Sequence, residues 1–531
     1  MNENNILDYL NERGVEYINK IIGSNNKTDY RKIKKLFLKG IVELNNFPDC
    51  EMVIGDFEWA GEDRDRNWWW QMQSLPFLAW YVNSYNLQTD LEKKSFFNLC
   101  WKSLENWKDK ALKAESPLVW HDHASAFRVR NIVNWLVFCC IHASQLNGDI
   151  KNQVSILVKE HLCWLSQDKN FSRYTNHGFD QAMISLVISL MFGGGLFEKI
   201  KIINKERLLE ELRHAFTDEG VHKENSPGYQ KFMLERVRQL RIIKILGETD
   251  VSDLVDFYVD KAEVFLRALT LPNGYLPLIG DTKLEMGLMG SDIDCAKVHP
   301  YLDVYDYSKS GYLIAKGVDG LQKSFFLLLK NSHLSNYHRH DDDMMIYLFY
   351  DGEVVFGDGG LFNHQEKDGR RKNIRSYRSH CVPYIDTLAI RDRRNLSEDA
   401  VVETLSDREF YMESSMFGKR LCRRVCLEIE SGLKLRINDR PKEKINEKVW
   451  SNFLIPHEKK FEIENNAAVF RFQDFSCFIR YEAGTEFFSV LGWDDLDYCN
   501  GAYFSEKYGE IKSACRISFS CADLEIDFNS N

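Results

Sequence analysis

The pattern of apolar and polar residues changes along this chain near residue 300. Before that point, apolar residues recur at the spacing of an amphipathic helix, and short polar or Gly/Pro links separate the periodic stretches. The stretch at 182–192 is apolar nearly all round, which is typical of an inner helix covered on both sides. Successive antiparallel helices of this kind build a bundle or an α/α toroid. The predicted helices cover residues 33–44, 68–81, 91–107, 129–143, 154–165, 179–192, 205–216, 230–246 and 251–269.

After residue 300, short runs rich in β-branched and aromatic residues, several of them bounded by Asp-Gly or Ser-Gly turns, predict strands. About a dozen strands without intervening helices indicate an antiparallel sandwich. The predicted strands cover residues 311–316, 324–329, 344–350, 353–356, 387–391, 410–414, 420–430, 433–437, 468–472, 476–481, 487–491 and 514–519. We therefore expect an α+β multidomain chain with a helical domain at 1–300 and a β-sandwich at 301–531, because 531 residues exceed the size of one core.

The net charge of −10 argues against non-specific binding to nucleic acid or to an anionic membrane. A polyanionic ligand would need a local basic patch, and five basic residues lie between positions 370 and 378. We expect Arg371 and Arg375 to lie at the rim of a cleft and to attract such a ligand. A solvated loop is the alternative interpretation of a charge run like this one.

Thirteen cysteines without CxxC spacing do not form a disulfide framework, which favours a reducing compartment. The N-terminus has no apolar signal-peptide core, and the longest apolar stretch is shorter than the roughly 20 residues of a membrane span. We expect a soluble monomer or homodimer without a membrane span. A cytoplasmic location is favoured, and a periplasmic or secreted one is open if the chain is a mature form.

The sharpest local motif is Tyr-His-Arg-His-Asp-Asp-Asp at 337–343, which leads into a predicted strand. On an extended chain, His338 and His340 would point to the same face. Asp358 follows at the end of the next predicted strand, and His380 lies in a later loop. His340, Asp358 and His380 offer two imidazoles and a carboxylate, a ligand set suited to zinc. A solvated turn is the alternative for an isolated His-x-His.

The helical half contains three polar islands at loops or helix starts: Trp-His-Asp-His at 120–123, Asn-His-Gly at 176–178 and Glu-Asn-Ser-Pro-Gly-Tyr at 224–229. Each has an ordinary structural explanation, such as a helix N-cap at Asn176 or a helix start at Ser-Pro. Together, polar residues at the ends of successive inner helices would ring the central cleft of a toroid. A glycan-binding cleft needs that arrangement.

In this order and spacing, six motifs resemble those of the heparinase II/III-type polysaccharide lyases, a family that includes related alginate lyases. The motifs are Asn-His-Gly at 176–178, Glu-x-Ser-Pro-x-Tyr at 224–229, Pro-Leu-Ile-Gly-Asp at 277–281, Ser-Gly-Tyr at 310–312, His-x-His-x-Asp at 338–342 and Gly-Asp-Gly-Gly at 357–360. The resemblance implies an incomplete α/α toroid followed by an antiparallel β-sandwich. It also implies β-elimination at a uronate of an acidic polysaccharide or oligosaccharide.

The resemblance further implies roles for single residues. Asn176 and His177 would bind and neutralise the uronate carboxylate. Tyr229 would be the general acid to the leaving oxygen, and the base for one epimer. His338 would be the general base at C5.

Supporting residues follow from the same resemblance. His340, Asp358 and His380 would hold a structural zinc ion, and no organic cofactor is expected. Arg128 would orient the carboxylate, while Glu224 and Tyr377 would contact substrate. His380 departs from the family pattern because Cys-Val-Pro follows it instead of Asn.

The residue types suit this chemistry. Donors that bind the carboxylate stabilise the enolate-like charge that develops when the weakly acidic C5 proton leaves. Histidine is an effective base because its unperturbed pKa is about 6.5. Tyrosine, with an unperturbed pKa of about 10, is protonated by default and can donate to the departing oxygen.

Two other functions fit the same residues. A protein with this fold could bind an acidic glycan without cutting it, although His338 and Tyr229 are both present. A toroid-type glycoside hydrolase needs two carboxylates across the scissile bond, for which Glu224 and Asp122 are candidates. A lyase product absorbs in the ultraviolet and a hydrolase product does not. Heparan-like, hyaluronan-like, alginate-like and capsule polymers all present a uronate, so the glycan stays open.

Overall fold

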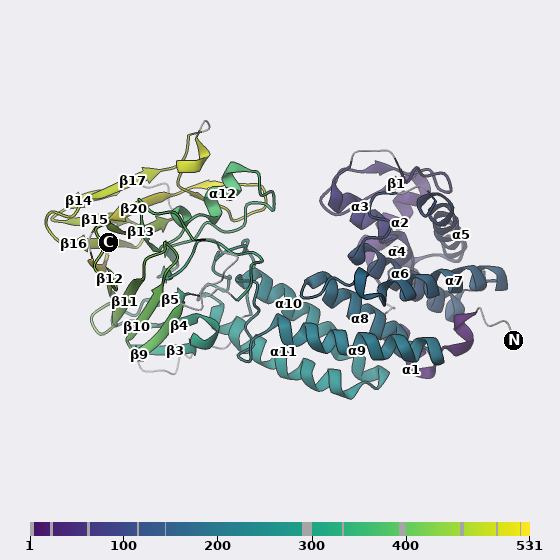
Figure 1. Ribbon diagram of the computed structural model, residues 1–531. Helices are drawn as coiled ribbons and strands as arrows, with labels where there is room; N and C mark the ends of the chain where they lie inside the picture. The colour runs from purple at the N-terminus through teal and green to yellow at the C-terminus, as the bar shows by residue number, and fades with distance from the viewer. Residues whose placement is uncertain are drawn as a thin grey trace. The chain divides into compact units, whose positions relative to one another are not determined.

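Two compact units make up the chain in the computed structural model (Figure 1). The helical unit contains Met1–Ala215 and Arg238–Asp256, and the strand unit contains Phe216–Val237 and Phe257–Asn531. The structure describes residues 5–21, 25–60, 64–113, 116–143, 145–288, 300–331, 334–391, 400–456, 461–494, 497–520 and 522–531. Helix α11 (Thr249–Leu269) precedes strand β3 (Tyr301–Tyr307), so the secondary structure changes where the pattern predicted. His299, at the predicted boundary, lies outside the described residues.

The helices of the helical unit pack against their neighbours along the chain and against helices further away in sequence. Helix α8 packs against α6 and α9, and α6 also contacts α4 and α7 (Figure 1). Most of α8 is buried, as expected for the inner helix predicted from its nearly all-round apolar surface. The helices are α1 (Glu12–Ile21), α2 (Lys27–Lys39), α3 (Arg66–Gln73), α4 (Pro76–Asn83), α5 (Asp90–Asn106), α6 (Asp122–His142), α7 (Gly148–Leu165), α8 (Asn176–Met191) and α9 (Gly195–Ala215).

Local signals explain where these helices begin. Thr89 and Glu92 form a reciprocal capping box at the start of α5. Thr175 accepts a hydrogen bond from the Gly178 N–H and so caps α8. The single helix predicted at 68–81 is wrong: Pro76 cannot continue α3 and instead begins α4.

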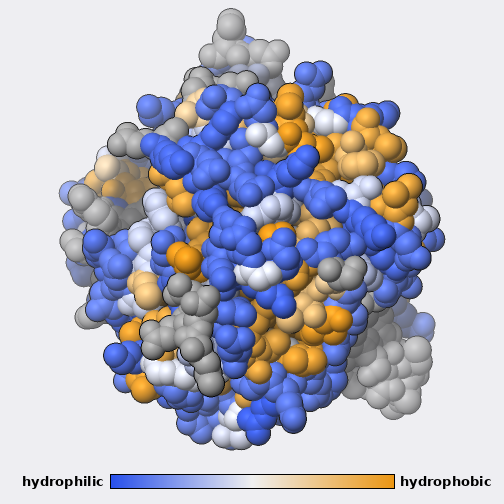
Figure 2. All heavy atoms as spheres, turned by 90° about the vertical axis from the view of Figure 1, so that its right-hand side faces the viewer, coloured by the Kyte–Doolittle hydropathy of each residue, from blue (hydrophilic) through white to orange (hydrophobic). Residues whose placement is uncertain are grey.

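Helix α6 is the one described helix that is long and apolar enough to cross a membrane by length and composition alone. The structure buries 78% of its most apolar window, as in the core helix of a water-facing domain. Hydrophilic residues with scattered hydrophobic ones cover the face at the right-hand side of Figure 1 (Figure 2). The apolar residues of α6 therefore serve packing within the helical unit.

Three antiparallel sheets form most of the strand unit, which confirms the predicted sandwich class. The five-stranded sheet has the order β3-β4-β5-β6-β7, with β4 (Tyr312–Val318), β5 (Ser324–Lys330), β6 (Met345–Tyr350) and β7 (Glu353–Phe356). The eight-stranded sheet has the order β14 (Glu462–Glu464), β15 (Ala467–Arg471), β16 (Phe475–Tyr481), β21 (Asp523–Ser530), β12 (Lys434–Pro441), β11 (Leu421–Glu428), β10 (Glu409–Ser414) and β9 (Val401–Ser406). The four-stranded sheet runs β17 (Phe487–Leu491), β20 (Cys515–Phe519), β13 (Val449–Ile455) and β8 (Pro383–Ile385). The strand predicted at 387–391 is wrong, and β8 lies just before it.

The five-stranded sheet is buried on both faces, which explains the unbroken apolar runs in β5 and β6. On one face, Phe325 and Leu327 join the core shared with the other two large sheets. On the opposite face, Phe326 and Leu328 pack in a second core that includes Phe265 of α11. The sheet is thus a rigid support for the loop between its strands β5 and β6.

The loop between β5 and β6, described at 331 and 334–344, is anchored by a buried ion pair. Lys330, the last residue of β5, donates from Nζ to Asp342 Oδ2 at 2.7 Å, and neither side chain reaches solvent appreciably. Asp342, the acidic residue of the His-x-His-x-Asp motif, therefore has a structural contact. The pair fixes the end of the loop that carries His338 and His340.

Replacing Asp342 with Ala is expected to reduce the free energy of unfolding by about 3–5 kcal/mol, because Lys330 would keep a buried charge without this carboxylate. Urea unfolding followed by circular dichroism measures the loss. Asp351→Ala is the matched control, since it breaks the more exposed Lys323–Asp351 pair and should cost under about 1 kcal/mol. Equal losses in the two variants would contradict a structural role for the buried pair.

Candidate active site

Tyr229 lies in the first turn of α10 (Pro227–Gln239). Proline at the first helical position and the Ser226 Oγ, which accepts a hydrogen bond from the Tyr229 N–H at 3.4 Å, explain why the helix begins here. Just before the helix, Asn225 has a positive φ of 59° and donates from Nδ2 to the Tyr337 backbone oxygen at 3.0 Å. Asn225 therefore ties the start of α10 to the loop that carries His338.

The rings of Tyr229 and His338 stack with their centroids 3.7 Å apart and an angle of 24° between their planes. The Nδ1 atom of His338 lies 2.7 Å from Asp281 Oδ2. Its Nε2 atom lies 3.6 Å from Glu224 Oε2. The structure thus places Tyr229, Glu224 and Asp281 around His338, and all of these except Asp281 were predicted as site residues.

Asp281 is a fully buried carboxylate with three donor side chains around it. His338 binds one oxygen, His340 Nε2 lies 2.9 Å from the other, and Arg371 donates to both. Burial alone would raise the pKa of Asp281, but the hydrogen bonds from His338, His340 and Arg371 hold it well below its usual range. The carboxylate is therefore ionised and acts only as an acceptor.

Ionised Asp281 determines which nitrogen of His338 carries the proton. Because the carboxylate can only accept, His338 Nδ1 is the donor. In the neutral ring, Nε2 then holds the lone pair. The pKa of Tyr229 is raised by burial and by the negative charges of Asp281 and Glu224, so its hydroxyl keeps its proton at neutral pH.

The prediction that His338 and His340 point to the same face because they lie on an extended chain is wrong. Their loop is not extended: His338 lies in a turn and has a φ of 55°. The two rings meet because both contact the same carboxylate, that of Asp281. The positive φ at a non-glycine residue is locally strained and is held by these contacts.

Three groups of His and acidic residues within the described parts of the chain have ligand atoms close enough for a metal ion. They are His121–Asp122–His177, Asp281–His338–His364 and His340–Asp358–His380. The distances do not show which of these groups would bind a metal ion. The hydrogen bonds of the histidine nitrogens distinguish the group of His340 from the group of His121.

The group His340, Asp358 and His380 has the strongest reason to hold a metal ion. All three side chains are buried, and His340 Nδ1 and His380 Nε2 have no hydrogen-bond partner. Unpartnered buried polar atoms are costly, and a metal ion would satisfy both nitrogens. The residue types of the predicted ligand set suit a zinc ion, and their ligand atoms lie within 4.8 Å of one another, with His380 Nδ1 2.8 Å from Asp358 Oδ2.

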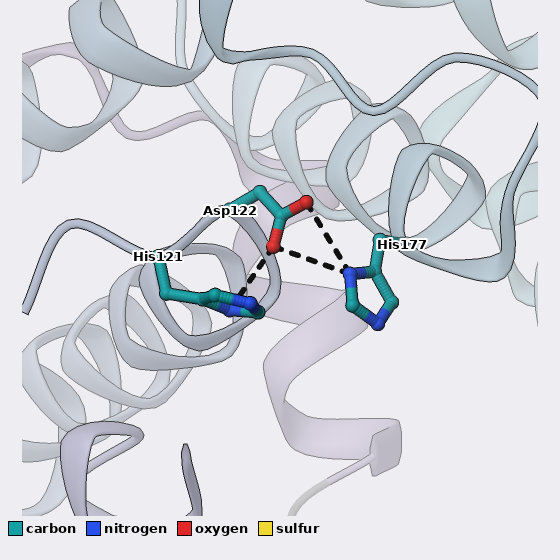
Figure 3. Close-up of side chains that lie close together, drawn as sticks. All are labelled: His121, Asp122 and His177. Carbon is teal, nitrogen blue, oxygen red and sulfur yellow. Dashed lines mark hydrogen bonds and ion pairs between the residues drawn. The ribbon is translucent and has the colours of Figure 1, made fainter. Parts of the chain in front are cut away.

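His121, Asp122 and His177 form a different kind of group in the helical unit (Figure 3). Both imidazoles turn Nδ1 toward the carboxylate: His121 lies 3.0 Å and His177 3.2 Å from Asp122 Oδ1. Arg66 Nη2 lies 3.0 Å from His121 Nε2, and a guanidinium can only donate. His121 Nε2 therefore holds a lone pair and its Nδ1 holds the proton. Nδ1 makes no hydrogen bond of good geometry, but in this ring form it faces Asp122 as a donor and cannot bind a metal ion.

Asp122 is the acceptor at the centre of the group of His121, Asp122 and His177. Burial would raise its pKa, but hydrogen bonds from His121, His177 and Ser172 hold it well below its usual range. His177, the first-turn neighbour of Asn176 in α8, thus has Nδ1 fixed on a carboxylate while its side chain stays partly exposed. The ring of His123 stacks on that of His177 with centroids 4.2 Å apart.

A buried glutamate, Glu211, hydrogen-bonds to the loop that precedes Asn176. Glu211 of α9 accepts a hydrogen bond from the Tyr174 N–H at 2.8 Å, and Tyr174 has a positive φ of 62°. Burial raises the pKa of Glu211 to about 7, although the hydrogen bond from Tyr174 lowers it. Glu211 therefore supports the segment that presents Asn176 and His177.

Arg128 has no exposed surface. It donates from Nε to His161, from Nη1 to the Gln73 backbone oxygen and from Nη2 to the Val119 backbone oxygen. Burial lowers its pKa to about 9. The expectation that Arg128 orients a substrate carboxylate gives way to a structural role in linking three segments of the helical unit.

The predicted basic patch also has protein partners. Arg371 is buried on Asp281, and Arg375 donates to the Arg339 backbone oxygen and pairs with Glu366. Tyr377 is half-buried, and its ring packs against Tyr384 at 4.8 Å. For Arg371, the structure shows an internal contact in place of the surface position that was expected. Contact of Arg375 or Tyr377 with substrate stays a prediction.

Sequence reasoning quoted Asp281 only as part of a motif and gave it no role, and it missed His364. The ring centroid of His364 lies 5.8 Å from that of His338. Burial lowers the pKa of His364. Its position a few residues after the Gly-Asp-Gly-Gly motif was the available signal.

No protein-family model matches this chain, and no curated protein matches it. Solved structures do match. A heparinase III with methylated lysines has a TM-score of 0.72 at 12% identity, with 96% of this chain and 84% of that chain covered. A heparan sulfate lyase from Pedobacter heparinus has a TM-score of 0.70 at 13% identity, covering 98% and 88%. A further heparinase III has a TM-score of 0.70 at 12% identity, covering 99% and 93%.

These likenesses establish the fold. The chain has the architecture of the heparinase III structures, an N-terminal α/α toroid followed by a C-terminal antiparallel β-sandwich, as predicted. At 12–13% identity, the similarity to these structures supports the architecture only, and the chemistry must be inferred from the residues of the site.

Replacing Glu211 with Gln is expected to remove a pH-dependent part of the stability. The pKa of Glu211 is about 7 in the folded chain and 4.5 for an unperturbed glutamate, so the folded state holds this proton more tightly. Its contribution is fully present below about pH 4.5 and is lost as the pH rises through about 7. The melting temperature of the wild type, measured relative to that of Glu211→Gln, should therefore fall between about pH 5 and pH 8.

Glu210→Gln is the control for this prediction. The pKa of Glu210 is lowered, chiefly by its hydrogen bond from Tyr174, so Glu210 stays ionised across the same pH range. The melting-temperature difference between the wild type and Glu210→Gln should not change over that range. A constant difference for Glu211→Gln as well would show that Glu211 is not protonated in the folded protein near neutral pH.

Proposed function

We propose that this protein is a polysaccharide lyase that cleaves a uronate-containing acidic glycan by β-elimination. The observation that carries the proposal is the stacked Tyr229–His338 pair with His338 Nδ1 on the Asp281 carboxylate. This geometry supplies a base and an acid side by side, with their protonation states set by their surroundings. β-Elimination requires that combination and no covalent nucleophile.

In the proposed step, His338 Nε2 takes the C5 proton of the uronate. The electron pair of the C5–H bond forms the C4=C5 double bond, and the bond from C4 to the leaving oxygen breaks. The Tyr229 hydroxyl gives its proton to that oxygen. The products are a 4,5-unsaturated uronate and a new sugar hydroxyl, so atoms and charges balance. Burial supports the acid role, because it keeps the Tyr229 proton in place until the oxygen departs.

The carboxylate of the same uronate would be neutralised by Asn176 and His177. Asp122 holds His177 by Nδ1, which leaves Nε2 for the substrate. Hydrogen bonds to the carboxylate strengthen as charge develops on it, which lowers the barrier to removal of the C5 proton. That these two residues and the Tyr229–His338 pair meet on one sugar is part of the proposal.

The hydrolase alternative needs one carboxyl group that is protonated before the reaction. Asp122 does not fit this role, because its hydrogen bonds from His121, His177 and Ser172 overcome the effect of burial and keep its pKa low. Its oxygens are also occupied by these donors. Of the two candidate carboxyl groups, Asp122 is therefore excluded as the acid, and the absorbance of the product tests the role of Glu224.

We further propose that His340, Asp358 and His380 hold a zinc ion. The unpartnered His340 Nδ1 and His380 Nε2 support this ligand set. Bound zinc would supply a fixed positive charge that organises the loop of His338. The proton transfers in the proposed step involve only His338 and Tyr229.

Tyr229→Phe is expected to retain the fold and substrate binding and to lose most turnover, because general acid catalysis contributes about 10²–10⁴-fold. His338→Ala should lose turnover to a similar extent, with some rescue by Tyr229 on one epimer. The measurement is ultraviolet absorbance of the unsaturated product on a panel of uronate polysaccharides. Tyr337→Phe is the matched control, since it removes the hydroxyl of an exposed neighbouring tyrosine.

Two outcomes would contradict the lyase proposal. One is wild-type turnover in Tyr229→Phe. The other is cleavage of the polysaccharides without an absorbing product, which would indicate hydrolysis. Binding without cleavage of every uronate polymer in the panel would instead indicate a glycan-binding protein.

Protein loaded with zinc and then desalted is expected to retain one zinc ion per chain at this site, and His380→Gln should lose it, because one imidazole ligand is removed. Elemental analysis measures the content, with circular dichroism to verify the fold. His142→Ala, at the end of α6, is the control and should retain the ion. A wild-type protein that retains no metal after zinc addition would disprove the site.

A further inference from the structure

The carboxylate of Asp281 joins two histidines to which the proposed function gives different tasks. Its Oδ2 lies 2.7 Å from Nδ1 of His338, the proposed base. Its Oδ1 lies 2.9 Å from Nε2 of His340, a proposed zinc ligand. Arg371 donates to both oxygens from α12 (Gly369–Arg375) and holds the carboxylate between the two rings.

The contact with Asp281 determines which nitrogen of His340 is available to a metal ion. Asp281 only accepts, so His340 Nε2 must carry a proton. In the neutral ring, Nδ1 then holds the lone pair. That Nδ1 is the buried atom without a hydrogen-bond partner, in the group with Asp358 and His380. Asp281 therefore selects the ring form of His340 that binds zinc.

The other oxygen of Asp281 acts in the same way on His338. It keeps the proton on Nδ1 and leaves Nε2 as the base. The His338 side chain is partly exposed and its backbone has a positive φ. Its contact with Asp281 at 2.7 Å, together with the stacking on Tyr229, holds the ring in position.

We infer that Asp281 is a positioning residue that couples the metal site to the catalytic base. When His340 Nδ1 is bound to a metal ion, its proton cannot move there, so Nε2–H always points at Asp281. Asp281 then stays fixed and continues to hold His338. Without the ion, the hydrogen bond to Asp281 alone holds the His340 ring, so the ring is less firmly fixed and supports the carboxylate less. The inference rests on the proposed function and extends it from the reacting residues to the link between the two sites.

Asp281→Asn tests this coupling, because the amide keeps the shape but is a neutral, weaker acceptor and has only one oxygen. We expect zinc affinity to fall about 10–100-fold, as for other groups that orient a metal-binding histidine. We also expect kcat to fall by more than KM changes. Competition with a chromogenic chelator measures affinity, and the ultraviolet assay measures kcat and KM.

Two controls accompany this variant. Asp368→Asn alters a more exposed carboxylate that pairs with Arg370 and should change neither quantity. His338→Ala should lose most turnover but should lower zinc affinity far less than Asp281→Asn does, because His338 is not a ligand. Unchanged zinc affinity or unchanged kcat in Asp281→Asn would overturn the coupling.

A second pair of variants tests the link without altering Asp281. His340→Gln and His340→Ala should both lose zinc, but the glutamine amide can still donate to Asp281 Oδ1. We expect His340→Gln to retain a higher kcat than His340→Ala. Equal kcat values would overturn the coupling even if Asp281→Asn did not fold. If no lyase activity is found at all, the proposed function fails, while the affinity measurements still decide whether Asp281 orients His340.

Discussion

The site depends on one buried negative charge, the carboxylate of Asp281. An ionised carboxylate without partners in a protein interior is destabilising by several kcal/mol. His338, His340 and Arg371 must therefore stay beside it. They come from the loop between β5 and β6 and from α12, so the need to satisfy one charge holds separate segments around Tyr229. Gly280 makes the approach possible, because its φ is 54° and a Cβ there would lie 3.0 Å from the Asn225 backbone oxygen.

The sequence was sufficient to predict the architecture, because the spacing of apolar residues along a helix or strand reflects which of its faces are buried. The inner helix α8 and the doubly buried strands β5 and β6 show apolar residues where the core needs them. The prediction at 68–81 failed because apolar residues continue across a break that only Pro76 marks. The strand at 387–391 failed for the converse reason: an apolar run with strand-like composition lies in a turn, and pairing with β13 falls on 383–385.

The motifs that contain Tyr229, His338, His340, Asp358 and His380 stand out in the sequence, and the structure places these residues in two groups. The residues that contact them could not be predicted from the sequence. Asp281 is 57 positions from His338, and its role depends on a contact that only the fold creates. For the same reason, Arg128 and Arg371 looked available to substrate, although both are buried on internal acceptors. Sequence shows the chemical type of a side chain, but not whether the protein already uses it.

Two of the three histidine–carboxylate groups, His121–Asp122–His177 and His340–Asp358–His380, show why hydrogen bonding must be considered before a metal is assigned. Both meet the distances of a metal site. In one, Arg66 at Nε2 of His121 leaves the proton on Nδ1, which then faces Asp122. In the other, Asp281 at Nε2 of His340 is an acceptor and leaves a lone pair on Nδ1. A donor or an acceptor on the far side of the ring thus decides whether the nitrogen that faces the group holds a proton or a lone pair, and only a lone pair can bind a metal ion.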